Sequence, residues 1–161
     1  MIEEDIRIEL DKNWEFKKQD TATDREIEAF LQGVEKGKEI GAEEKAELDD
    51  IILFEKLVSN LVQAMNATSD FIKTIISSGF KCEGARLKIE HNKSFTAILI
   101  IKETDFCSDA FLDIYKQAMK KEDELNTNTF NLSFSFISDN KFLNVNSMIA
   151  DGFKFSYERK T

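Results

Sequence analysis

A cluster of acids and one thiol follows directly after the most apolar stretch of the chain. The stretch is Phe95–Ile101, and Asp105, Cys107 and Asp109 come shortly after it. Ligands in crossover sheets gather where strands end and helices begin, so this cluster is a candidate ligand site. The carboxylates could hold Mg²⁺, and a thiol beside a helix start could be reactive. The acids also suit an ordinary helix start, because negative charge there favours the helix dipole.

The rest of the sequence offers no second set of catalytic partners. Cys82, Cys107 and the single histidine, His91, lack the spacing of a zinc site. No Gly-x-Ser-x-Gly, phosphate-binding glycine loop, dinucleotide glycine pattern or His-Glu-x-x-His occurs. We therefore predict a non-enzymatic protein with no metal and no cofactor. The alternative is a metal- or small-molecule-dependent enzyme with its site at the end of strand 95–101.

Composition limits the partners. Among 161 residues, 31 are acidic and 22 are basic, which gives a net charge of −9. Duplex nucleic acid and anionic membrane surfaces would be repelled by that charge. The N-terminus is acidic where a secretory signal would be basic, and no apolar run approaches the ~20 residues of a membrane span. We expect a cytoplasmic protein with both thiols free, which binds itself or another protein and binds neither nucleic acid nor membrane.

The elements that must position the acidic cluster follow from the periodicity of residues 80–161. In Phe95–Ile101 both alternating faces are apolar, which predicts a central strand buried on both faces. Residues 87–91 alternate with one wet side formed by Arg86, Lys88 and Glu90, and the turn at 92–94 predicts a hairpin. A helix over 109–126, capped by Ser108, leads to a strand over 130–136, set parallel to the central one by a right-handed crossover. A short helix or loop and a last strand over 153–157 complete a β-β-α-β-β unit. We predict a small mixed sheet with a helix packed on one face.

Residues 23–79 form a predicted helical region before the sheet. Its first stripe has three-four spacing and consists of Ile27, Phe30, Leu31 and Val34. Gly33, Gly37 and Gly41 then interrupt the pattern, and a second stripe runs from Leu48 to Met65. A polar interruption at residues 66–69 predicts a break before a further turn and a half, and Gly79 is expected to end the helix. The fold class is therefore α+β, with N-terminal helices followed by the sheet unit.

Residues 1–22 form a predicted N-terminal arm that is a short strand, a hairpin or a docking segment. Trp14 and Phe16 favour docking, since a lone tryptophan in a free tail would be exposed. Together with the helical stripes they carry more apolar surface than a four-stranded sheet is expected to cover. We therefore predict self-association or partner binding through the N-terminal half. The predicted partner-binding residues are Trp14, Phe16, Ile27, Phe30, Leu31 and Val34.

The succession of a helix, a hairpin, a crossover helix and a further strand is similar to the nucleotidyltransferase arrangement. That family's Gly-Ser motif and paired metal-binding aspartates are missing. The segment 97–100, Ala-Ile-Leu-Ile, stands about where such acids would be. The resemblance therefore implies an inactive relative.

Overall fold

The computed structural model describes residues 13–16 and 45–158 of the chain. In chain order these residues form β1 (Trp14–Phe16), α3 (Lys45–Ser77), β2 (Cys82–His91), β3 (Ser94–Lys102), α4 (Glu103–Phe106), the 3-10 turn η1 (Asp109–Phe111), α5 (Leu112–Leu125), β4 (Asn131–Asp139), α6 (Val145–Ala150) and β5 (Phe155–Tyr157). The predicted α+β class and the mixed sheet are confirmed.

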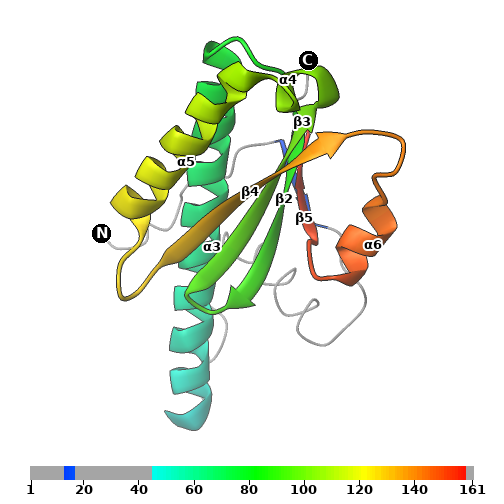
Figure 1. Ribbon diagram of the computed structural model, residues 1–161. Coiled ribbons are helices and arrows are strands. Elements are labelled where there is room, and N and C mark those ends of the chain that lie inside the picture. The colour runs from blue at the N-terminus through cyan, green and yellow to red at the C-terminus, as the bar shows by residue number, and fades with distance from the viewer. Residues whose placement is uncertain (1–12, 17–44, 159–161) are drawn as a thin grey trace.

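The described residues form a sheet of five strands in the order β1-β5-β2-β3-β4, most of which are labelled in Figure 1. β2 and β3 form the predicted hairpin, and β4 pairs parallel to β3 as the crossover predicted. The fifth strand, β1, was not counted among the four predicted from residue 80 onward. It joins the sheet antiparallel to β5, with Trp14 opposite Tyr157.

The strand predicted at the centre, β3, lies between β2 and β4, although the middle position belongs to β2. Its residues Phe95, Ala97, Leu99 and Ile101 are fully buried on the face that carries α3 and α5. On the other face Ile100 is buried and Ile98 is half-buried. Burial is therefore complete on one face and partial on the other.

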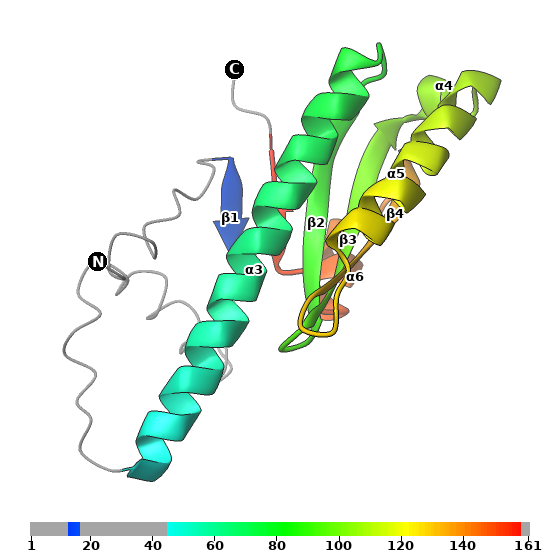
Figure 2. The ribbon, with the colours of Figure 1, turned by 90° about the vertical axis from the view of Figure 1, so that its left-hand side faces the viewer.

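Two helices, α3 and α5, cover one face of the sheet, and α6 lies on the opposite side (Figures 1 and 2). This division follows from the direction of the two crossovers. The chain passes outward from β3 to β4 through α5, and returns from β4 past β3 and β2 to β5 through α6. Because crossovers of parallel strands share one hand, opposite directions along the sheet require opposite faces.

The helix α3 is continuous over 33 residues, so the predicted break at residues 66–69 is wrong. The hydroxyls of Thr68 and Ser69 donate to the carbonyls of Ala64 and Met65, four residues earlier, at 2.7 and 3.0 Å. The hydroxyls of these side chains thus find hydrogen-bond acceptors inside the helix, although Thr and Ser in isolation favour caps and turns. Gly79 ends the helix as predicted, with a φ of +94° that suits glycine.

α3 and the sheet share one hydrophobic core. Leu61, Met65 and Ile75 of α3 are fully buried together with Leu87 and Leu99 of the sheet. The side chain of Asn60 also donates to the carbonyls of Asn92 and Thr129, at 3.1 and 3.2 Å, which ties α3 to two turns of the sheet unit. The predicted boundary between residues 79 and 80 therefore lies inside a single core.

The predicted helix over 109–126 is shorter and begins differently. The turn η1 precedes α5, and Ser108 does not cap it with its side chain. Instead the Ser108 hydroxyl donates to the Asp105 carbonyl at 2.7 Å, across the end of α4. The extra helical turn α4 lets the chain bend sharply from the end of β3 toward α5, on the face of the sheet that α3 and α5 cover.

Arg86 does not lie on a wet face as predicted, since only 7% of its surface is exposed. It stands between Ile98 of β3 and Ser156 of β5 on the face that α6 crosses. The same crossing brings Gly152 to the stem of Lys88, whose ammonium lies 5.6 Å from the centre of the Phe153 ring. Burial lowers the pKa of Arg86, and the charge of Glu158 partly opposes that shift.

Gly84 permits the close approach of β5 to β2. A side-chain carbon at this position would lie 2.7 Å from the backbone oxygen of Tyr157, which is closer than van der Waals contact allows. The register of β2 against β3 also shifts between Cys82 and Gly84, as at a β-bulge. The bulge and the absence of a side chain at Gly84 together allow Tyr157, the last residue of β5, to lie close to the backbone of β2.

Candidate functional site

The predicted ligand cluster lies where β3 turns into α4 and η1, and Asp105 there has a structural partner. Its Oδ2 accepts a hydrogen bond of 2.7 Å from the backbone N–H of Lys81. The carboxylate therefore ties the loop after α3 to the exit of β3. Cys107 and Asp109 are exposed beside it. Within residues 13–16 and 45–158, no group of three or more His, Cys, Asp or Glu side chains is placed to hold a metal ion.

Aromatic rings fill the space beneath this exit. Phe111 is fully buried, and its ring centre lies 5.3 Å from that of Phe80, 5.4 Å from that of Phe136 and 5.5 Å from that of Tyr115. All three pairs are edge-to-face, which is a favourable arrangement of aromatic quadrupoles. Packed aromatic rings thus anchor η1, the turn that begins at Asp109.

His91 does not approach Cys107. It ends β2 at the hairpin, opposite Ser94 at the start of β3, whereas Cys107 follows the far end of β3. A nine-residue strand separates the two ends by roughly 30 Å. The histidine therefore cannot serve as a base for this thiol.

Two hollows lie between α3 and α5, away from the exit of β3. They share Asp70 and Lys121, so they form one groove along the two helices. Phe71, Ala67 and Leu125 contribute its apolar part. Carboxylates, lysines and amides of both helices surround that part, and this mixture of charges defines no single ligand.

The two cysteines differ in accessibility, and both are free. Cys107 is exposed, whereas Cys82 is buried in β2 with its thiol 3.3 Å from the Gly84 carbonyl. Burial raises the pKa of the Cys82 thiol from its ordinary value of 9.0 to about 11, and the charge of Glu83 adds to this.

A thiol reagent should therefore modify one cysteine quickly in the native protein and the other only after unfolding. The fast residue is Cys107, so Cys107→Ser should abolish the fast phase of modification. Two fast thiols in the wild type would contradict this prediction.

The raised pKa of Cys82 also predicts a loss of stability in alkali. The buried thiol's contribution to the free energy of unfolding is complete below about pH 9, because the thiol is then protonated in both the folded and the unfolded protein. That contribution disappears as the pH rises through about 11. The free energy of unfolding of Cys82→Ala should fall less than that of the wild type over this range. Parallel pH profiles of the free energy of unfolding for the wild type and Cys82→Ala would contradict this prediction.

Trp14 and Phe16, predicted to bind a partner, lie against this chain's own residues. The Trp14 indole donates to the Ser69 hydroxyl at 2.8 Å, and its ring packs edge-to-face on Tyr157 at 5.4 Å. Phe16 stacks on Phe155 at 4.7 Å. The other predicted partner-binding residues, Ile27, Phe30, Leu31 and Val34, and the glycines 33, 37 and 41 lie outside the described residues.

The N-terminal turns of α3 carry exposed apolar side chains. Figures 1 and 2 show that these turns extend past the β2–β3 hairpin. Ile52 and Leu53 are 43% and 53% exposed. Both residues lie within the predicted apolar stripe from Leu48 to Met65, and helical periodicity does not show where the sheet beneath a helix ends.

No family model, curated protein or solved structure matches the chain. In the part of the chain that the structure describes, no helix is both long and apolar enough to cross a membrane. The fold and the sites together define a mixed α+β protein. Its sheet packs beneath a long helix that continues beyond the sheet.

Proposed function

We propose that this chain is a non-enzymatic cytoplasmic binding protein that associates with a second copy of itself through the N-terminal turns of α3. The observation that carries the proposal is the exposure of Ile52 and Leu53 on turns that extend beyond the sheet (Figure 2). Grouped apolar side chains on a protruding element are typical of interaction surfaces. Two such helices, packed about a two-fold axis, would cover these side chains at once.

The residues near the end of β3 supply less support for the alternative, an enzyme. Of the three predicted ligand-site residues, Asp105 comes first after the strand, and its carboxylate accepts from the Lys81 amide. Cys107 and Asp109 are exposed. Self-association therefore rests on a feature with no other role in the described fold, whereas the predicted ligand-site residues include one with a structural role.

Sedimentation velocity at tens of micromolar tests the proposal. We expect the wild type to sediment as a dimer, and the double variant Ile52→Glu, Leu53→Glu to sediment as a monomer. The dissociation constant should rise at least about tenfold, because the loss of two apolar contacts exceeds 1.4 kcal/mol. The matched control is Glu55→Gln, Lys56→Gln in the same exposed turns, which should remain dimeric. A compact wild-type monomer at this concentration would refute self-association.

A further inference from the structure

The edge strand β4 has two halves that differ in how its outward backbone groups are satisfied. In the first half, the Leu132 N–H donates to Asn126 Oδ1 at 2.8 Å and the Phe134 N–H donates to Glu122 Oε1 at 2.7 Å. Both acceptors come from the C-terminal end of the α5 segment. Side chains thus close this half against pairing with another strand, which is a common protection of sheet edges.

In the second half of β4, no side chain of the described residues accepts from an outward amide in this way. The register of β4 against β3 is regular from Asn131 to Asp139, so successive amides alternate between β3 and the free edge. The next outward amides after Leu132 and Phe134 are therefore those of Phe136 and Ser138. Among the described residues, neither of these amides has a hydrogen-bond acceptor. A strand that pairs here would gain both donors and the carbonyls beside them.

One face of α5 follows this edge and changes character at the same point. Its members have alternating three-four spacing and are Leu112, Tyr115, Met119, Glu122 and Asn126. The last two cap the closed half of β4. The first three are apolar and are 61%, 37% and 64% exposed. The Tyr115 ring lies 4.9 Å from the Phe136 ring, which places the apolar part of the face beside the open half of the strand.

We propose that the open half of β4 and the apolar residues Leu112, Tyr115 and Met119 bind an extended peptide segment of a partner protein. The segment adds to the sheet beside β4 and places apolar side chains, at every second position, against α5. Backbone hydrogen bonds then provide affinity, and the α5 side chains provide selectivity. This surface is separate from the α3 turns, so it goes beyond the proposed self-association.

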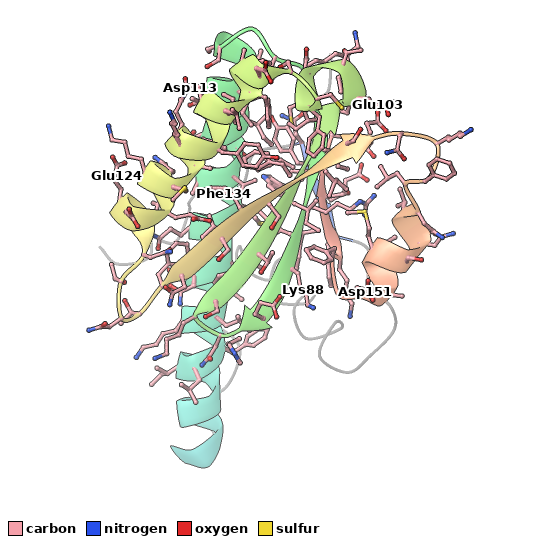
Figure 3. The ribbon with its side chains drawn as sticks, in the orientation of Figure 1. Lys88, Glu103, Asp113, Glu124, Phe134 and Asp151 are labelled. Carbon is pink, nitrogen blue, oxygen red and sulfur yellow. The ribbon has the colours of Figure 1, made fainter. Side chains whose placement is uncertain are left out.

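The position of α5 selects a single peptide strand over a second copy of this chain. Since Glu122 and Asn126 reach the outward amides of β4 from α5, the helix lies over the edge of the sheet, as Figure 3 shows beside Phe134. Antiparallel pairing of two β4 strands about a two-fold axis would bring both α5 helices to one face. Strands pair at about 4.8 Å, whereas packed helices need about 8–10 Å between their axes. A lone extended segment carries no helix and avoids this conflict.

A phage-displayed library of random nonapeptides, selected on the full-length protein, tests the proposal. We expect enriched peptides with apolar residues at alternate positions. Met119→Glu should weaken their binding at least about tenfold, and Ser138→Pro should do the same by removing one outward amide. The Ser138 amide does not bond to β3, so the proline costs no internal ladder bond. Lys120→Glu, on a neighbouring face of α5, is the control and should bind as the wild type does.

Amide hydrogen exchange of the bound protein locates the peptide even if a variant is destabilised. Binding should slow exchange at Phe136 and Ser138 and leave Leu132 and Phe134 unchanged. Failure to enrich any peptide on the wild type, or protection confined to other amides, would overturn the proposal. Protection of Phe136 and Ser138 in the free protein that increases with its concentration would assign the edge to a second copy, and would also overturn it.

Discussion

A fragment of residues 80–161 is expected to remain unfolded, although it contains four of the five strands of the described sheet. Without α3, the fully buried side chains Leu61, Met65 and Ile75 are lost, and Leu87 and Leu99 face water. α5 cannot replace α3, because the two helices lie side by side over different parts of the same face (Figure 2). A sheet with an uncovered apolar face lacks the burial that offsets chain entropy. Dispersion of NMR amide signals and urea unfolding measure the outcome.

The fragment 45–161 is the matched control for this truncation. It restores α3 and lacks only β1 among the described elements. We expect it to unfold cooperatively at a lower urea concentration than the full chain, since the core keeps both helices and four strands. Cooperative unfolding of 80–161 alone would show that the sheet unit is an independent domain and that the shared core does not decide folding.

Trp14→Ala is expected to destabilise the full chain by about 3–5 kcal/mol, as other truncations of large buried aromatic side chains do. Trp14 is 7% exposed and lies in the same core as Leu61 and Met65, far away in sequence. Its loss removes the packing on Tyr157 and the hydrogen bond to the Ser69 hydroxyl. β1 has three residues, and besides Trp14 the Phe16–Phe155 stack and the strand pairing hold it to β5.

Two further variants divide this effect between packing and hydrogen bonding. Trp14→Phe retains a ring against Tyr157 and should cost less than Trp14→Ala. Ser69→Ala leaves the indole N–H buried without its acceptor and should cost about 1–3 kcal/mol. Urea or thermal unfolding of the four proteins measures these differences. A Trp14→Ala protein as stable as the wild type would show that the Trp14 side chain contributes nothing to the stability of the fold.

The elements of residues 80–161 were predictable because local patterns determine them. The alternation in Phe95–Ile101, the short turn before it and the length of the connection to β4 each depend on neighbouring residues only. Gly79 ended α3 as predicted for the same reason, since its positive φ is a local property. The continuity of α3 through Thr68 and Ser69 was missed, because their capping preference is outweighed by packing of the helix on the sheet.

The sequence by itself determined the α+β class, the hairpin, the parallel pairing of β4 and the order of the elements after residue 80. The tertiary structure alone decided that Trp14 packs on Tyr157, that Arg86 is buried and that half of the β4 edge is open. The physical reason is the range of the interactions. Helix and strand periodicity arise within a few residues, whereas burial and edge exposure depend on which distant segments meet, and no local pattern records that meeting.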